Sequence, residues 1–277
     1  MKNNIDLDYV NSRRLLLPDT KNIHLHLVGC GGTGSWLAPA VVRVAKVLKE
    51  RFDKEVSVHF YDPDKVEEKN TYRQNFCAAE IGVNKAETLA QRYGLAWGIE
   101  IEAVVRKFVS FWPADNELTV IIGCVDNWQA RKEIASQQPA GHVSNLGKYN
   151  IWWLDSGNSR NSGQILLGSI SKNQNDPFQL EEICTWLPTP AVDHPELIEE
   201  PELEEAALDE NISCAEMALR DSQGLAINQR MAAEAADYLV RMLITKDLHK
   251  FATYVDLESG TTRSKYITEK AIKGYLK

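Results

Sequence analysis

The chain lacks several features that would place it outside the ordinary globular proteins. No apolar run approaches the length that crosses a bilayer, and the polar N-terminus does not resemble a signal peptide. No internal repeat is present. The formal net charge of −8 does not favour binding to nucleic acid, which is itself negatively charged. With 277 residues, 44% of them hydrophobic, the chain has enough apolar material for one sizeable core.

Metal-binding cysteine pairs are absent as well. The sequence has five cysteines and no C-x-x-C pair, so four soft ligands at zinc spacing cannot be assembled. We therefore predict no structural zinc. An odd number of cysteines without disulfide-like spacing fits a reducing compartment, and we expect a cytoplasmic protein.

Basic residues are missing from one long acidic stretch. Between Asp193 and Glu210 the chain has no Lys or Arg. Such a run is typical of a solvated, mobile loop, and we assign residues 191–212 to it. The alternatives are an inert insertion and a segment that contacts a second subunit.

A glycine-rich turn is the first positive signal. The apolar alternation of residues 24–28 precedes it and a helix-like run over 35–44 follows it, which together predict a strand, a tight turn and a helix start. Glycine allows close backbone approach, and unpaired N–H groups at a helix start attract phosphate. A dinucleotide site, a mononucleotide site and a merely tight turn all fit. The glycines are Gly29, Gly31, Gly32 and Gly34.

Asp62 closes a second apolar strand, residues 56–61. At the carboxyl edge of a parallel sheet, such a carboxylate can accept hydrogen bonds from ribose hydroxyls. A turn aspartate before Pro63 is the alternative interpretation.

Three charged residues then favour a triphosphate over a nicotinamide dinucleotide. Arg73 can grip phosphate oxygens bidentately, and Lys85 supplies a point charge. Asp126 ends the apolar strand 120–125 and offers a hard oxygen ligand for magnesium. A nicotinamide-dependent oxidoreductase would leave these three residues without a purpose.

Together these motifs resemble the ThiF/MoeB/HesA family, whose members adenylate the C-terminus of small ubiquitin-like proteins. The resemblance implies an α/β fold with a Rossmann-like, doubly wound, mostly parallel sheet and a C-terminal helix and hairpin. It assigns residues 21–277 to one adenylation domain after an N-terminal arm, residues 1–20, with a C-terminal segment at 213–277. It also implies ATP and Mg2+ as cofactors. The implied nucleotide-binding residues are the glycine turn, Asp62 at the ribose, Asn70, Arg73, Gln74 and Lys85 at the phosphates, and Asp126 with Asn127 at the magnesium.

Two further segments resemble functional parts of that family. Residues 12–18 resemble the segment that sends an arginine into the neighbouring subunit's site, with Arg13 the best match and Arg14 the next, which implies a homodimer. A plain basic arm is the alternative. Residues 212–216 resemble the segment whose cysteine accepts the acyl group. Cys214 is therefore the candidate nucleophile, favoured by a nearby helix N-terminus and opposed by the upstream acids, with Cys184 as second candidate.

The resemblance implies chemistry that needs no general base. An ionised C-terminal carboxylate attacks the α-phosphate of ATP, so the protein supplies positioning and charge stabilisation. Within the family, the pattern looks most like the ThiF-type proteins of the bacterial PRTRC plasmid-associated systems. That likeness implies a small ubiquitin-like protein and a ubiquitin-conjugating-enzyme-like protein as partners. The alternatives are a sulfur-carrier adenylyltransferase of ThiF/MoeB type and a non-catalytic nucleotide-binding scaffold.

Overall fold

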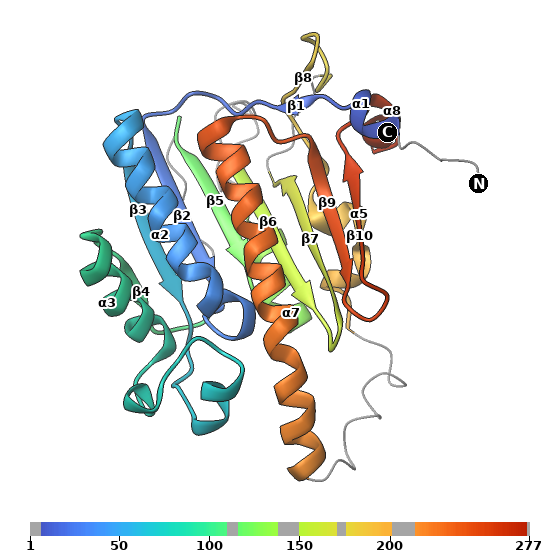
Figure 1. The fold of residues 1–277 in the computed structure, drawn as a ribbon. Coiled ribbons are helices and arrows are strands. Elements are labelled where there is room, and N and C mark those ends of the chain that lie inside the picture. Colours follow the sequence, from blue (N-terminus) through green and yellow to red (C-terminus); the bar gives the residue numbers. More distant parts are fainter. Residues whose placement is uncertain (1–6, 110–115, 138–149, 171–175, 201–213, 276–277) are drawn as a thin grey trace.

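The structure is a computed structural model that describes residues 7–109, 116–137, 150–170, 176–200 and 214–275. Side chains are described throughout these ranges except for Leu7 and residues 214–225. Within them the centre is an eight-stranded sheet in the order β10-β9-β7-β6-β5-β2-β3-β4 (Figure 1). The strands are β2 (Asn22–Val28), β3 (Glu55–Tyr61), β4 (Glu102–Val104), β5 (Leu118–Gly123), β6 (Asn150–Asn158), β7 (Ser162–Ser169), β9 (Lys250–Asp256) and β10 (Thr261–Tyr266).

The sheet has a parallel half and an antiparallel half. Strands β4, β3, β2, β5 and β6 pair in parallel, and β7, β9 and β10 continue the sheet in antiparallel fashion. Helices cover both faces, as parallel strands require. The predicted α/β class, the mostly parallel sheet and the terminal hairpin are confirmed.

Two groups of helices enclose the sheet (Figure 1). On one face, α2 (Gly32–Phe52) packs on β2 and β3, α3 (Lys85–Trp97) flanks it, and α7 (Cys214–Val240) packs on β6 and β7. On the other face lie α4 (Trp128–Ala135), α5 (Pro190–Asp193) and the short helix η4 (Pro195–Ile198). The remaining short elements are α1 (Leu7–Val10), β1 (Arg14–Leu15), η1 (Glu68–Tyr72), η2 (Ala78–Glu80), β8 (Ile183–Cys184), η5 (Arg241–Thr245) and α8 (Glu269–Lys273).

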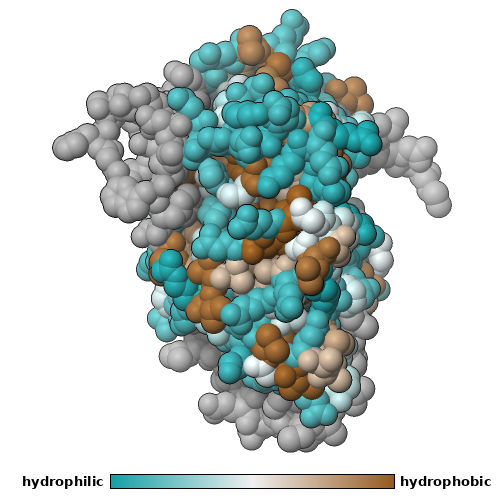
Figure 2. All heavy atoms as spheres, turned by 90° about the vertical axis from the view of Figure 1, so that its left-hand side faces the viewer, coloured by the Kyte–Doolittle hydropathy of each residue, from teal (hydrophilic) through white to brown (hydrophobic). Residues whose placement is uncertain are grey.

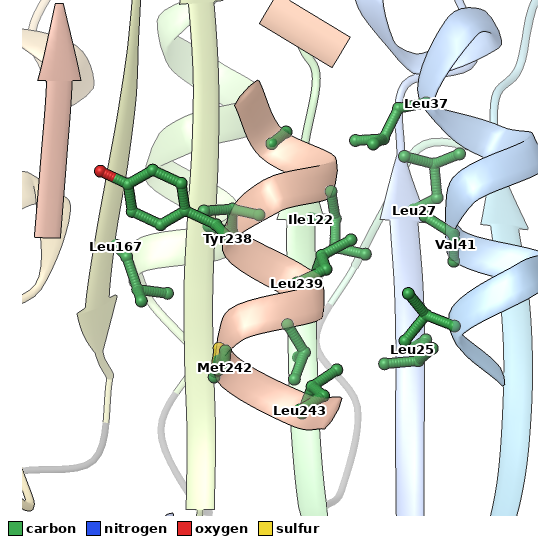
Figure 3. Close-up of a cluster of buried hydrophobic side chains, with 14 of the residues drawn as sticks. Leu25, Leu27, Leu37, Val41, Ile122, Leu167, Tyr238, Leu239, Met242 and Leu243 are labelled. Atoms are coloured by element: carbon green, nitrogen blue, oxygen red, sulfur yellow. The ribbon is translucent and has the colours of Figure 1, made fainter. Parts of the chain in front are cut away.

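Strand patterning places a separate core on each face of the sheet. In β3 the residues Val56, Val58 and Phe60 are buried while their neighbours are partly exposed, because only one side meets α2 and α3. All six residues of the central strand β5 are buried. The larger core joins β2 and β5 to α2 and α7 (Figure 3). The smaller core, behind the sheet, includes Ile134 of α4 and Trp153 of β6.

Part of the predicted acidic loop is folded. Within residues 191–200, the helices α5 and η4 replace the expected mobile chain, and the side chain of Asp193 is only 5% exposed. Its carboxylate pairs with Lys265 Nζ at 3.0 Å, and Tyr275 donates a hydrogen bond to it. A partner 72 residues away decides this conformation, which local composition does not reveal. The rest of the loop, residues 201–213, lies outside the described residues.

The described part of the N-terminal arm is tied to the far end of the chain. Strand β1 pairs with β8 in a separate two-stranded sheet, and Leu15 is 1% exposed. The backbone N–H groups of Arg13 and Leu15 donate to the carbonyls of Ile267 and Leu248. None of the described helices is both long and apolar enough to span a bilayer.

The edge that carries α3 and β4 shows hydrophobic spots separated by hydrophilic side chains (Figure 2). Exposed apolar residues of this region include Ile81, Leu95 and Val105. Because the spots are separated, this view shows no continuous apolar face. A substitution of a single exposed residue there is expected to change stability little.

We expect Leu239→Ala to destabilise the fold by about 2–5 kcal/mol, because its fully buried side chain fills the larger core between α7 and the sheet (Figure 3). Urea unfolding followed by circular dichroism measures the loss. The matched control is Leu95→Ala on α3, where the side chain is 80% exposed and the expected change is within about 0.5 kcal/mol. Equal losses in the two variants would contradict the assigned core.

Candidate active site

A cavity of about 950 Å³ opens where β2, β3, β5 and β6 end. The predicted nucleotide-binding residues reach it from five separate stretches of chain, although Gly34 does not line it. Parallel strands bring their carboxyl ends to one edge of the sheet, which explains why residues so far apart in sequence meet here. The predicted residues that line the cavity are Gly29, Gly31, Gly32, Asp62, Asn70, Arg73, Gln74, Lys85, Asp126 and Asn127.

The glycine turn is pressed against the end of β5. Gly29 has φ +88°, and a Cβ there would lie 2.6 Å from the carbonyl oxygen of Cys124. A Cβ on Gly34 would lie 1.9 Å from the carbonyl oxygen of Gly29, a distance that no side chain can tolerate. The turn therefore needs glycine at both positions, one for backbone conformation and both for space.

Asp62 braces this turn from β3. Its carboxylate accepts the N–H of Cys30 at 2.7 Å and the N–H of Asp64 at 2.9 Å. Burial raises the pKa of Asp62, while these two hydrogen bonds and nearby Lys85 oppose the rise. The residue is thus both a turn aspartate, as the alternative interpretation held, and part of the cavity wall.

The loop that carries the arginine motif is anchored to α2 through a proline. Pro39 lies inside α2 and has no N–H, so the carbonyl of Ser35 loses its usual helical partner. The side-chain amide of Asn75 donates to that carbonyl at 3.3 Å, and the Asn75 N–H donates to Ser35 Oγ at 2.9 Å. Trp36 Nε1 donates to the carbonyl of Arg73 at 3.2 Å. These contacts fix the loop over the start of the helix.

Two asparagines shape the loops on the β3 side. The side-chain oxygen of Asn70 accepts the N–H of Glu67 at 2.8 Å, so this residue closes its own loop. Asn84 caps α3 and also donates to the carbonyls of Asp62 and Asp64, at 2.9 Å each. Lys85 follows directly, and its Nζ lies 3.3 Å from Asp64 Oδ2. The lysine is therefore held at the cavity wall by the cap beside it.

Asp126 follows β5 and presents an exposed carboxylate to the cavity. Asn127 caps α4 by accepting the N–H of Ala130 at 2.9 Å, and it donates to Asp126 Oδ1 at 3.2 Å. No cluster of three or more His, Cys, Asp or Glu that could hold a metal occurs in the described ranges. A magnesium ion at Asp126 would therefore take most of its ligands from phosphate oxygens and water.

The sequence prediction missed an ion pair on the β6 side. Arg131 of α4 donates from Nε to both carboxylate oxygens of Asp155, at 3.1 and 3.3 Å. Asp155 is fully buried, which raises its pKa, and Arg131 opposes that rise. Arg131 itself lines the cavity. Its place on α4, four residues after the helix cap Asn127, was the available signal.

Asn228 of α7 was also missed. It is 2% exposed, and its side-chain oxygen accepts from Asn158 Nδ2 at 3.1 Å and from Thr33 Oγ1 at 3.4 Å. The helical pattern of α7 had suggested only a core-facing stripe. The contact instead joins three segments, α2, β6 and α7, at the cavity wall.

Several buried polar atoms of the cavity wall have no hydrogen-bond partner among the described residues. They are Gln74 Oε1, Ser156 Oγ and Asn228 Nδ2. An unsatisfied buried polar group costs about 1–3 kcal/mol, so such groups are rare unless a ligand or water completes them. The wall is therefore built to bind a polar molecule.

The structure places the predicted arginines of the arm outside this cavity. Arg13 pairs with Glu269, stacks over the ring of Phe178 at 4.8 Å and donates to the carbonyl of Leu180 at 3.2 Å. Arg14 is exposed on β1. Neither residue lines the cavity of its own chain, and the predicted reach into a second subunit stays a prediction.

The cysteines differ sharply in environment. Cys184 is fully buried, its thiol donates to the carbonyl of Trp186 at 2.9 Å, and burial raises the pKa of Cys184 to about 12. Cys30 and Cys124 also have their pKa raised by burial, as packed thiols do. Cys77 is exposed. Cys214 begins α7, but its side chain lies outside the described residues.

Fold and site together define a nucleotide-binding α/β protein of Rossmann-like architecture. The chain matches the ThiF family over residues 8–178, and it belongs to that family. No curated protein matches it.

Solved structures of similar fold include PaaA, with TM-score 0.52, 15% identity, and coverage of 88% of this chain and 64% of PaaA. The structure of Escherichia coli MccB with ATP has a TM-score of 0.53 and 14% sequence identity, and the match covers 90% of this chain and 65% of MccB. The microcin C7 biosynthetic enzyme MccB in complex with N-formylated MccA has a TM-score of 0.53 and 13% sequence identity. The match covers 90% of this chain and 66% of that protein. The chain thus spans about two-thirds of the length of these proteins, and the likeness shows that they share its fold.

We expect Gly34→Ala to abolish nucleotide binding and to lower the thermal midpoint, because its methyl group would collide with the Gly29 carbonyl and push α2 away from the turn. Thermal unfolding with and without ATP measures both effects. The control is Gly274→Ala, where nothing lies within 4 Å of the added Cβ. An unchanged midpoint for Gly34→Ala would mean that the turn is looser than its contacts indicate.

Proposed function

We propose that this protein is an ATP-dependent activating enzyme that adenylates the C-terminal carboxylate of a small ubiquitin-like protein. The observation that carries the proposal is the cavity, which joins the glycine turn, Asp62, Arg73, Lys85 and Asp126 at one edge of the sheet. Membership of the ThiF family supports it. The bound ATP in a MccB structure supports ATP as the nucleotide.

Each part of the cavity has a role in this proposal. The first turn of α2 and the glycine turn offer N–H groups to phosphate, and Asp62 accepts from the ribose. Arg73 and Lys85 offset the charge of the phosphates. A magnesium ion held by Asp126 would supply further positive charge where pyrophosphate leaves.

The chemistry consists of positioning and charge stabilisation. A carboxylate oxygen of the acyl substrate forms a bond to the α-phosphorus, and the bond from that phosphorus to the bridging oxygen breaks as pyrophosphate departs. The carboxylate is already ionised at neutral pH, so no general base is required. The chain's task is to hold the two anions in line, which lowers the barrier through proximity and preorganised donors.

In a second step, the thiolate of Cys214 would attack the carbonyl carbon of the acyl adenylate, the bond from that carbon to the AMP oxygen would break, and a thioester would form as AMP leaves. This residue is the first of α7, and a helix N-terminus favours the thiolate form. Transfer onward to a ubiquitin-conjugating-enzyme-like protein, as in the bacterial PRTRC-type systems, completes the proposed cytoplasmic role. In the proposed homodimer, Arg13 would have to leave Glu269 before it could reach a neighbouring site.

A peptide is the second candidate for the acyl substrate. MccB has been crystallised with N-formylated MccA, and its fold resembles that of this chain. The nucleotide half of the proposal is the same in both cases, because only the carrier of the carboxylate differs. A sulfur-carrier protein would likewise use the same first step.

We expect ATP–pyrophosphate exchange that depends on a small ubiquitin-like protein. Asp126→Ala should reduce this exchange by at least about 100-fold, because removing one group that stabilises transition-state charge typically costs that much. Glu50→Ala, which removes an exposed acid of α2, is the control and should exchange normally. Full exchange in Asp126→Ala would remove this residue from the mechanism. ATP binding without exchange in the presence of any ubiquitin-like protein tested would favour a non-catalytic nucleotide-binding scaffold.

Cys214→Ala should retain ATP–pyrophosphate exchange and lose the thioester, because adenylation does not use the thiol. A thiol-sensitive adduct with the carrier on a non-reducing gel is the measurement. Cys77→Ala removes an exposed cysteine elsewhere and should keep the adduct. An undiminished adduct in Cys214→Ala would direct attention to Cys184.

A further inference from the structure

The end of β6 carries a group of cavity residues that the nucleotide roles above do not use. Strand residues alternate between the two faces of a sheet, so Asp155 and Gly157 point to the α4 side, while Ser156 and Asn158 point to the α7 side. In Figure 1, β6 lies between β5 and β7, with α7 across it. The cavity therefore wraps around this strand end, and both of its sides are polar.

On the α4 side, Arg131 offers a fixed fork of donors. Its Nε contacts both oxygens of Asp155, which is fully buried and so cannot turn toward water. Neither of its two Nη groups donates a hydrogen bond to a described residue. A guanidinium held in this way presents parallel N–H groups, the arrangement that binds a planar carboxylate bidentately.

On the α7 side, two neutral groups without partners face the same space. Asn158 and Thr33 donate to the side-chain oxygen of Asn228, which leaves its buried Nδ2 as a donor with no acceptor among the described residues. Ser156 Oγ is also buried and unpaired with any described residue. Such groups suit the peptide oxygen and N–H of a polypeptide end, which carry no net charge.

Gly157 keeps the gap in front of Arg131 open. A Cβ at this position would lie 3.2 Å from Arg131 Nη2 and 3.8 Å from Gln164 Cγ of the paired strand β7. A side chain here would therefore press on the guanidinium. Its absence leaves room for an extended chain to approach along the strand end.

The group is also separated from the proposed ribose contact. Strand β6 is three strand spacings from β3, which carries Asp62 at its end, and this corresponds to about 14 Å. The glycine turn follows β2, between the two. A nucleotide with its ribose at Asp62 and its phosphates at the turn leaves the β6 end for another ligand.

We propose that the β6 end of the cavity is the subsite for the acyl substrate, in which Arg131 binds the terminal carboxylate of a polypeptide. Asn228 and Ser156 bind the peptide group that precedes this carboxylate, and Asp155 is the positioning residue for Arg131. The assignment rests on the proposed function for the reaction that follows, whereas the binding step can be measured without any reaction.

The binding test uses a pool of synthetic hexapeptides with free C-terminal carboxylates and the same pool amidated. Both are offered to the protein with Mg2+ and a non-hydrolysable ATP analogue. Wild type should bind the carboxylate peptides more tightly than the amidated peptides. In Arg131→Gln the ratio of these two affinities should fall about 10- to 100-fold, as expected for the loss of charge-assisted hydrogen bonds. The affinity for the ATP analogue should stay unchanged.

A matched control removes a charge from the same helix. Lys132→Gln lies one residue further along α4, is exposed and does not line the cavity, so the preference should persist. Three results would overturn the proposal: no preference in wild type, a preference that survives Arg131→Gln, or an Arg131→Gln variant that loses affinity for the ATP analogue instead. The last result would assign the guanidinium to phosphate.

Exchange kinetics separate this proposal from the proposed function. If wild type catalyses ATP–pyrophosphate exchange in the presence of a small ubiquitin-like protein, Arg131→Gln should raise KM for that protein about 10- to 100-fold with little change in kcat. Arg131→Lys should recover only part of the loss. An unchanged KM would overturn the subsite and leave the activating enzyme intact. A carboxylate preference without any exchange would support the subsite and contradict the proposed activating enzyme.

Two further variants guard against misfolding. Asp155→Asn keeps the shape of the buried group but removes the charge that orients Arg131, and Gly157→Ala adds a methyl group against Arg131 Nη2. Both should weaken the carboxylate preference in the same direction as Arg131→Gln, at unchanged affinity for the ATP analogue. Normal preference in a folded Gly157→Ala variant would show that no substrate passes this position, which contradicts the subsite.

Discussion

The site depends on one backbone contact, between the glycine turn and the end of β5. Gly29, Gly34 and Cys124 meet so closely that no Cβ fits between them. This contact sets where α2 begins, and α2 in turn holds the arginine loop through Ser35 and Asn75. A shift of the turn would therefore move the phosphate-facing N–H groups and Arg73 together. Steric exclusion, rather than any single hydrogen bond, fixes the geometry of the nucleotide half.

Much of this half could be predicted from the sequence, because its signals are local. The glycine spacing, the acid at the end of a strand and the charges that follow each appear within a few residues of a strand end. Since parallel strands deliver their carboxyl ends to one edge, linear order was sufficient to bring Asp62, Arg73 and Asp126 to one cavity. The fold class follows from the same alternation of strands and helices.

The other half could not be predicted, because its residues acquire their roles only through tertiary contact. Asn228 belongs to a helix whose pattern indicates core packing, and only the packing of α7 beside α2 brings it to Thr33. Asp155 sits in an apolar strand, where its partner Arg131 is 24 residues earlier in the chain. The prediction of a loop over residues 191–200 failed for the same reason, because Asp193 pairs with Lys265, 72 residues later in the chain.

The Arg131–Asp155 pair also gives the two ends of the cavity different chemistry. A buried ion pair has little net charge, so it attracts a distant anion weakly and acts only at contact, through donors with a fixed direction. A triphosphate carries several charges and is drawn to cations from a distance, whereas a single terminal carboxylate is recognised by the planar fork that it fits. Cancelling the charge of Arg131 while keeping its Nη donors would therefore reduce competition from phosphate at this end. Burying Asp155 costs free energy, and the proposed binding of two different anions side by side supplies a reason for the fold to retain it.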